Sequence, residues 1–279
     1  MRNLTFITTP NLADQAACFR RAFMEKTAVW HVAIFECDST AKAETVLQGK
    51  EHAFVVAPVF RSILYDAGRA KGASAKLSQG SDVLYRGGSQ TITLAQLGRS
   101  VVDCIEELFI PLYGARVVIL GSGSAALDLA YECSRAGVDE ITLLDSDKER
   151  VQDNLSTFLE AFDRNRTSIL DTEQARLGHL SANRAYEHTS FRYGSLRALS
   201  SIRQADLVFS FLPESVVVPD YRDALKPSQI VCDPWGRSSS LLTQATEVGC
   251  DVVLWRSVMT FWGTACADLL IEFGNAGLK

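Results

Sequence analysis

The segment that most constrains the fold runs from residue 116 to residue 145. The apolar run RVVIL at 116–120 predicts a buried strand, and it leads directly into Gly-Ser-Gly-Ser-Ala-Ala at 121–126. A helix is expected from Ser124 to about Ala136, and ITLLD at 141–145 predicts a second strand. A strand, a crossover helix and a second strand form one α/β unit, in which the helix packs on a parallel sheet.

The glycine turn has the spacing G-x-G-x-x-A, which is typical of sites that bind the pyrophosphate of a dinucleotide. The first glycine permits a tight turn, the second lets the backbone approach the phosphates, and the small third residue lets helix and strand pack closely. The N–H groups at the helix N-terminus attract the anion. We therefore expect cofactor contacts from Gly121, Ser122, Gly123, Ser124 and Ala125.

An acidic residue, Asp145, ends the second strand about 22 residues after Gly123. A carboxylate at this spacing accepts hydrogen bonds from the adenosine ribose hydroxyls, and its charge repels a 2′-phosphate. Asp145 and the adjacent Ser146 therefore favour NAD over NADP as the cofactor. Two alternatives stay open, namely a glycine turn that binds nothing and a site for S-adenosylmethionine or a flavin.

Later apolar runs predict the rest of a parallel sheet. The run DLVFSFLP at 206–213 is typical of the strand that flanks the cofactor, so we expect Phe211, Leu212 and Pro213 near the ribose and nicotinamide. A buried strand that ends at a proline gives the same pattern. The runs at 229–233 and 251–255 predict further strands covered on both faces.

The first hundred residues mix strands and helices and contain no phosphate loop of their own. Strands are expected at 4–9, 29–36 and 53–60 and as a hairpin at 82–86 and 89–95, and helices at 13–26, 61–71 and 97–113. The expected fold is α/β in three parts. An N-terminal α/β domain covers 1–100, a Rossmann domain with a doubly wound parallel sheet covers 101–258, and a C-terminal helix within 259–279 packs back on the first domain.

Charge and composition argue against several classes of protein. The 28 lysines and arginines against 33 acidic residues, a net charge of −5, disfavour a nucleic-acid partner. No apolar run is long enough to predict a membrane span, and the N-terminus does not resemble a signal peptide. Seven scattered cysteines favour free thiols in a reducing cytoplasm. None of the four histidines lies at metal-ligand spacing from Cys, Asp or Glu, so no metal is expected.

The order of these parts resembles the shikimate/quinate dehydrogenase family. The best-matching segments are 117–151, 205–213, 229–250 and 258–274. The resemblance implies a substrate domain, a Rossmann domain, a cleft between them and a final helix that returns to the first domain. It also implies NAD as the cofactor, because Asp145-Ser146-Asp147 resembles the acidic loop of NAD-using members and not the Asn-Arg-Thr motif of NADP-binding ones.

The resemblance weakens at the positions that carry the family's chemistry. The family's catalytic lysine follows a proline, and alignment on Pro58 places Phe60 there, or Arg61 after a slip of one residue. The partner aspartate falls at Ala95. Arginine, with a pKa above about 12, does not readily exchange a proton. Oxidation of shikimate by the family mechanism is therefore not expected.

Two residues are the candidates for catalysis. Arg61 could hold a substrate carboxylate, as could Arg237, and Tyr65 could donate a proton. Trp262 belongs to a group of tryptophans that either line a pocket or pack in the core. We expect a cytoplasmic NAD(H)-dependent oxidoreductase that acts on a small polar molecule bound in the interdomain cleft. The alternative is a catalytically silent relative that binds NAD(H) or a metabolite as a sensor, regulator or subunit. A homodimer is left open.

Overall fold

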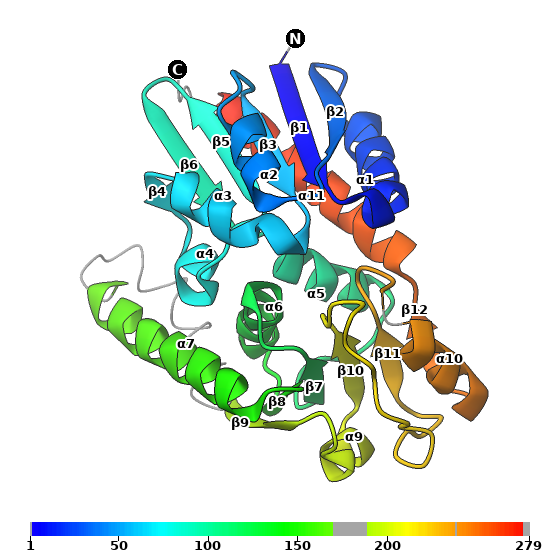
Figure 1. Ribbon diagram of the computed structural model, residues 1–279. Helices are drawn as coiled ribbons and strands as arrows, with labels where there is room; N and C mark the ends of the chain where they lie inside the picture. Colours follow the sequence, from blue (N-terminus) through cyan, green and yellow to red (C-terminus); the bar gives the residue numbers. More distant parts are fainter. Residues whose placement is uncertain (1, 170–188, 238, 276–279) are drawn as a thin grey trace. The chain divides into compact units, whose positions relative to one another are not determined.

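The computed structural model describes residues 2–169, 189–237 and 239–275, and the chain divides into two compact units (Figure 1). Unit 1 comprises Met1–Cys104 together with Arg256–Lys279, and unit 2 comprises Ile105–Trp255. Each unit is built on its own six-stranded sheet. The N-terminal and C-terminal parts of the sequence therefore share one sheet-based unit, and the segment between them forms the other.

Unit 1 contains a mixed sheet in the order β2-β1-β3-β5-β6-β4. Its strands are β1 (Arg2–Thr8), β2 (Trp30–Glu36), β3 (Ala53–Val56), β4 (Ala70–Lys71), β5 (Val83–Gly87) and β6 (Gln90–Leu94). β1 runs parallel to β2 and β3, whereas β5 is antiparallel to both β3 and β6. The hairpin predicted from the Gly87-Gly88 turn is therefore confirmed as β5 and β6.

The helices of unit 1 include the last helix of the chain. They are α1 (Ala13–Lys26), α2 (Thr40–Leu47), α3 (Arg61–Ala67), α4 (Ala73–Ser78), α5 (Leu97–Glu107, which continues into unit 2) and α11 (Trp255–Asn275). Trp262 of α11 contacts Phe6 of β1 and Phe19 of α1, with ring centroids 5.6 and 4.8 Å apart. The final helix thus packs on the first domain as expected. Trp262 is fully buried in this aromatic core and does not line a pocket wall.

Unit 2 is a doubly wound parallel sheet in the order β12-β11-β10-β7-β8-β9. Its strands are β7 (Arg116–Leu120), β8 (Glu140–Asp145), β9 (Ser190–Ser195), β10 (Leu207–Ser210), β11 (Ile230–Cys232) and β12 (Asp251–Val253). The helices are α6 (Ser124–Arg135), α7 (Lys148–Ile169), α9 (Leu199–Gln204) and α10 (Ser239–Val248). The chain order reverses between β7 and β10, and ligands of such sheets bind beyond the carboxyl ends of the strands at that point. The predicted α/β fold class is confirmed.

Two of the predicted elements of unit 1 are shorter than the apolar pattern indicated. The strand expected over 53–60 ends at Val56, because Pro58 has no N–H for the ladder and begins a 3-10 turn at Pro58–Phe60. The helix expected over 61–71 ends at Ala67, and Ala70–Lys71 instead pairs with β6. Helices α2 and α4, both short, were not predicted.

The helix expected over 97–113 ends at Glu107, and Phe109 is the reason. Phe109 has a left-handed backbone (φ 58°), its N–H donates to the Glu106 carbonyl, and the Ile110 N–H donates to the Ile105 carbonyl. These two bonds form a Schellman motif, which closes a helix by satisfying its last carbonyls. The side chain of Phe109 is 94% exposed, so it does not belong to an apolar helix face.

Candidate functional site

The glycine turn after β7 adopts a conformation that requires its first glycine. Gly121 has φ +108°, and its N–H donates to the Leu144 carbonyl of β8 at 2.7 Å. A Cβ at Gly121 would lie 3.3 Å from the carbonyl carbon of Phe211, which follows β10. Any other residue would therefore be strained by its backbone and crowded by the neighbouring strand.

The second glycine borders open space at the N-terminus of α6. Gly123 has φ −73°, and a Cβ built on it would meet nothing within 4 Å. As the N-cap residue of α6, Gly123 has no side chain to bond the N–H groups of the first turn. Ala125 and Ala126 are buried, so the helix starts close to the sheet. This geometry fits the close approach of a pyrophosphate to backbone N–H groups.

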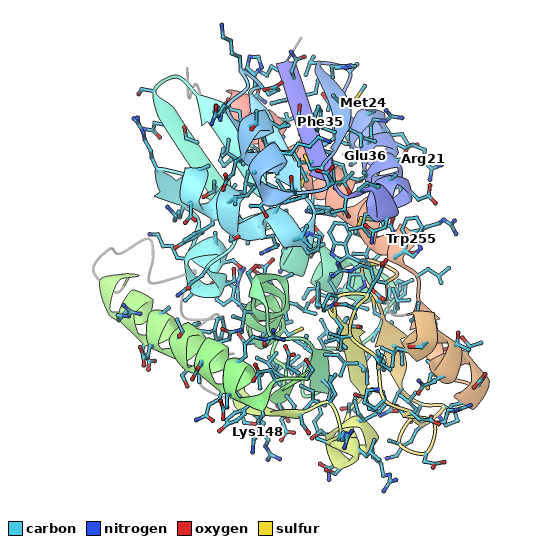
Figure 2. The ribbon with its side chains drawn as sticks, viewed as in Figure 1. Arg21, Met24, Phe35, Glu36, Lys148 and Trp255 are labelled. Atoms are coloured by element: carbon cyan, nitrogen blue, oxygen red, sulfur yellow. The ribbon has the colours of Figure 1, made fainter. Side chains whose placement is uncertain are left out.

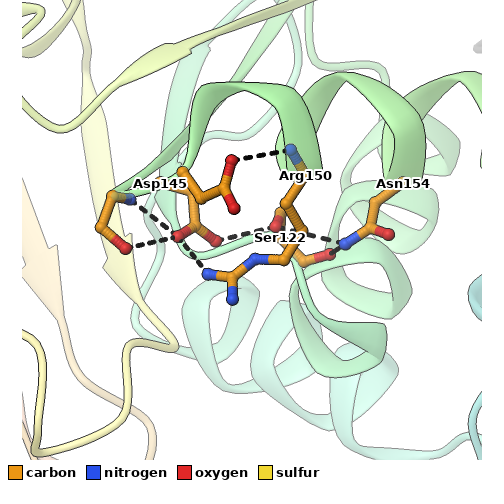
Figure 3. Close-up of polar contacts among 6 residues, drawn as sticks. Ser122, Asp145, Arg150 and Asn154 are labelled. Atoms are coloured by element: carbon orange, nitrogen blue, oxygen red, sulfur yellow. Dashed lines mark hydrogen bonds and ion pairs between the residues drawn. The ribbon is translucent and has the colours of Figure 1, made fainter.

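The acidic residue at the end of β8 lies in a network of hydrogen bonds (Figure 3). The carboxylate of Asp145 accepts from Ser122 Oγ at 2.7 Å, from the Ser146 N–H at 2.7 Å and from Arg150 at 2.5 Å. Asn154 Nδ2 donates to the Ser122 carbonyl at 2.9 Å. The network ties the glycine turn, the end of β8 and the first turns of α7 together.

These bonds are shared unequally between the two oxygens of the carboxylate, and one oxygen can still accept a further hydrogen bond. Oδ1 of Asp145 accepts from the backbone N–H and the hydroxyl of Ser146 and from Arg150, whereas Oδ2 accepts from Ser122. A carboxylate oxygen has two lone pairs, so Oδ2 can accept one more hydrogen bond. A ribose hydroxyl could supply it.

Asp145 is almost fully buried, and yet its carboxyl group loses its proton more readily than an ordinary aspartate does. Burial acts to raise the pKa of its carboxyl group, but hydrogen bonds from Ser122 and Arg150, together with the charge of Arg150, outweigh burial and lower the pKa below its usual value. The carboxylate is therefore negatively charged at neutral pH. Sequence reasoning selected Asp145 and missed Arg150, which lies in the first turn of α7.

This lowered pKa predicts how Asp145 contributes to stability at different pH values. Asp145 binds protons less readily in the folded state than in the unfolded chain, where an aspartate has a pKa of about 3.9. Its contribution is therefore complete above that value and is lost as the pH falls through the lower folded pKa. We expect the native protein to exceed Asp145→Asn in unfolding free energy at pH 7, and the difference to shrink as the pH falls below about 4.

Urea unfolding at pH 7, 5, 4 and 3 measures this difference, provided that both proteins remain folded at the start of each titration. Asp251→Asn is the matched control, because Asp251 is exposed at the start of β12 in the same sheet. A difference between native and Asp145→Asn that stays constant or grows as the pH falls would contradict the assignment.

The three residues expected to flank the cofactor after β10 have different environments. The Phe211 N–H donates to the Leu120 carbonyl at 2.8 Å, which places the Phe211 backbone beside the glycine turn. Leu212 is 2% exposed and belongs to the hydrophobic core of unit 2 with Val118. Pro213 is exposed. We therefore correct the expectation for Leu212, whose side chain packs in the core of unit 2.

In unit 1, Arg61 has a different partner from the one expected. Its side chain is 1% exposed and forms an ion pair with Asp82, which is also 1% exposed. The Asp82 carboxylate further accepts from the N–H groups of Gln96 and Leu97, at 2.8 and 2.9 Å. We correct the proposed role of Arg61, because a buried guanidinium held in this way is not available to bind a substrate carboxylate.

The resemblance placed Ala95 at the position of an aspartate, and Ala95 carries no acid. The carboxylate that pairs with Arg61 instead belongs to Asp82, just before β5. Tyr65, the second candidate, is half-buried on α3, and Lys71 Nζ lies 4.7 Å from the centre of its ring. Tyr65 as a proton donor stays a prediction.

Within the ranges 2–169, 189–237 and 239–275, no helix is long and apolar enough to cross a membrane. The same part of the chain contains no group of three or more His, Cys, Asp or Glu side chains that could hold a metal ion.

Together, the doubly wound sheet, the glycine turn after β7 and the acid at the end of β8 give unit 2 a Rossmann-type fold. No family model matches the chain. A segment of 55 residues is 38% identical to shikimate dehydrogenase (NADP(+)) of Acinetobacter baylyi, and it covers 20% of this chain and 21% of that protein. Sequence similarity to this curated relative is therefore confined to about a fifth of either protein.

Similarity in structure extends over almost the whole chain. Shikimate 5-dehydrogenase of Listeria monocytogenes, in complex with shikimate and NAD, matches with a TM-score of 0.73 and 15% identity, over 98% of this chain and 92% of that one. Ligand-free 5-ketofructose reductase of Gluconobacter sp. strain CHM43 matches with a TM-score of 0.70 and 15% identity, over 97% and 93%. The chain has the shikimate dehydrogenase fold, which confirms the resemblance at the level of structure.

Proposed function

We propose that this protein binds a nicotinamide dinucleotide at the carboxyl ends of β7, β8 and β10, prefers NAD(H), and acts as an oxidoreductase. The observation that carries the proposal is the open space at Gly123, beside the uncapped N-terminus of α6 and next to the Asp145 network. The substrate is a small polar molecule.

Buried free thiols at all seven cysteines suit a reducing cytoplasm. A homodimer stays a prediction.

Each part of the site has a separate task in binding. Gly121 makes the turn, Gly123 leaves room for the pyrophosphate, and the N-terminus of α6 offers N–H groups and the positive end of its dipole. Asp145 Oδ2 accepts a hydrogen bond from the adenosine ribose. The bound nicotinamide supplies hydride transfer. The protein's part is to orient that ring near Phe211, which borders the glycine turn.

The choice between NAD(H) and NADP(H) depends on two opposite charges. Asp145 is ionised and repels a 2′-phosphate, whereas Arg150 is the kind of residue that binds one. Arg150 is 53% exposed and is held by the Asp145 carboxylate in the ligand-free protein. We therefore expect Asp145 to set the preference for NAD(H), and its removal to free Arg150 for a 2′-phosphate.

Fluorescence titration with NADH and NADPH tests this proposal, and calorimetry with S-adenosylmethionine tests the main alternative ligand. We expect NADH to bind at least about tenfold more tightly than NADPH, which corresponds to about 1.4 kcal/mol. Asp145→Ala should reduce the ratio of NADH affinity to NADPH affinity at least tenfold. The double variant Asp145→Ala/Arg150→Ala should lose any gain in NADPH affinity. Equal affinities in the native protein, or binding of S-adenosylmethionine alone, would refute the proposal.

A catalytically silent relative is the second candidate function, and the Arg61–Asp82 ion pair favours it. A proton shuttle needs a group whose pKa lies near the working pH, and an arginine paired inside a core does not meet this requirement. Such a protein would bind NAD(H) without turnover. Reduction of NAD+ with any member of a panel of hydroxy and amino compounds would exclude it, whereas tight binding with no turnover on the whole panel would support it.

A further inference from the structure

The loop that follows β11 leads through a hydrogen-bonded turn to Arg237. The Trp235 N–H donates to Asp233 Oδ1 at 3.0 Å, and the Gly236 N–H donates to the Asp233 carbonyl at 3.1 Å. Gly236 has φ +64°, and a Cβ there would lie 2.5 Å from Cδ1 of Trp255, which is labelled in Figure 2. The turn therefore requires glycine at position 236, immediately before Arg237.

Arg237 is a partly buried cation without a partner for its charge. Its Nε atom is buried and makes no hydrogen bond, and no ion pair includes Arg237 in the part of the chain that the structure describes. Burial lowers the pKa of the guanidinium, while the negative charges of Asp233 and Glu214 act in the opposite direction. These carboxylates influence Arg237 from a distance and form no ion pair with it.

The lack of an ion-pair partner distinguishes Arg237 from Arg61 in the same chain. Arg61 is buried more completely than Arg237, and the Asp82 carboxylate satisfies it directly. A buried charge without such a partner costs stability, and groups of this kind cluster at binding and catalytic sites. The contrast indicates that Arg237 is placed for an anion that comes from outside the chain.

The position of Arg237 in the sheet indicates which anion. β11 lies next to β10, and both are on the opposite side of β7 from β8, which carries Asp145. If Asp145 holds the adenosine ribose, the reactive nicotinamide end of the dinucleotide extends toward the β10 and β11 side. A residue that follows β11 at the carboxyl edge is therefore beside the reacting end of the cofactor.

We infer that Arg237 binds the oxyanion of the substrate beside the nicotinamide, so that the substrate is a hydroxy or oxo compound that carries a carboxylate or phosphate. The location rests on the proposed function, whereas the need of Arg237 for an anion rests on its own burial. A guanidinium can bind either oxyanion through two parallel hydrogen bonds. The inference names the chemical class of the substrate and the residue that selects it.

Calorimetric titration of the NAD+-saturated protein with malonate, and separately with phosphate, tests this inference. We expect saturable binding of at least one of these anions, weakened at least tenfold in Arg237→Gln and less in Arg237→Lys. The stronger of the two identifies the oxyanion. Arg116→Gln is the matched control and should bind as the native protein does, because Arg116 is a half-exposed arginine at the opposite end of the strands in the same sheet.

Other outcomes would overturn the inference. One such outcome is that neither anion binds saturably to the native protein. Another is that the native protein and Arg237→Gln bind the anions with equal affinity. A tenfold loss of NAD+ affinity in Arg237→Gln with unchanged anion binding would place Arg237 on the cofactor and also overturn it. Failure of NAD+ to bind at all would refute the proposed function separately, and the same titrations on the cofactor-free protein would still decide whether Arg237 binds an anion.

A measurement of stability separates this role from a structural one. Arg237→Met removes a charge that the ligand-free protein leaves without a partner, so we expect its melting temperature to rise. A residue that supported the fold would give the opposite result, and a clear fall in melting temperature would count against the inference. Arg237→Lys keeps the charge, and its anion binding remains a test of the inference if the other variants fail to fold.

Discussion

Replacement of Asp82 by alanine is expected to lower the unfolding free energy by about 3–5 kcal/mol, the range for breaking a buried ion pair from one side. The variant leaves the Arg61 guanidinium inside unit 1 without its carboxylate, and both groups are only 1% exposed. It also removes the acceptor for the N–H groups of Gln96 and Leu97 at the start of α5. Urea unfolding monitored by circular dichroism measures the loss.

Two controls show whether the loss comes from the buried charge. The double variant Arg61→Met/Asp82→Asn removes both charges and keeps an acceptor for one N–H group, so it should recover at least half of the loss. Asp103→Ala breaks the partly exposed pair with Arg99 on α5, where about 0.5 kcal/mol is expected. A loss below 1 kcal/mol in Asp82→Ala would mean that the buried pair does not hold unit 1 together.

Replacement of Gly123 by alanine is expected to lower the affinity for NADH at least about tenfold, equivalent to about 1.4 kcal/mol, while stability changes little. The backbone of Gly123 has φ −73°, which any residue adopts, and a Cβ would meet nothing within 4 Å. The methyl group therefore meets no steric obstacle in the ligand-free protein. It occupies space that the pyrophosphate needs in order to approach the backbone.

Thermal unfolding and NADH fluorescence titration of the same samples separate the two effects. Gly114→Ala is the matched control, because Gly114 also borders open space but has φ +74° and lies before β7, away from the carboxyl ends. It should lose stability and keep NADH affinity. Unchanged NADH binding in Gly123→Ala would place the dinucleotide elsewhere or show that none binds.

The elements that sequence analysis located best are those whose pattern repeats within a few residues. The strand at 116–120 and the helix at 13–26 were predicted with the bounds that the structure shows. The strand is a continuous apolar run that ends at a glycine, and the helix has apolar residues at helical spacing. Errors appeared where the end of an element depends on a single backbone conformation. The left-handed Phe109 ended a helix that apolar spacing alone would have continued to 113.

In the candidate site, too, the features set by local spacing could be predicted and those set by distant contacts could not. The G-x-G-x-x-A turn and Asp145 could be recognised because their spacing in the chain follows from one βαβ unit. The partners of the charged side chains could not be recognised from the sequence. Asp82 is 21 residues from Arg61 in the chain and has no sequence signal that marks it as a partner, and Arg150 was overlooked because it follows the expected acidic loop.

By itself, the sequence determined the α/β class, the parallel order around the glycine turn and the placement of an acid at the end of the second strand, because each is a property of local periodicity and spacing. Only the tertiary structure decided which charges are satisfied. Arg61 has a buried carboxylate, Asp145 shares its oxygens with Ser122 and Arg150, and Arg237 has no ion-pair partner among the described residues. Burial and the distance between groups far apart in the chain set the cost of a charge, and neither exists until the sheet has formed.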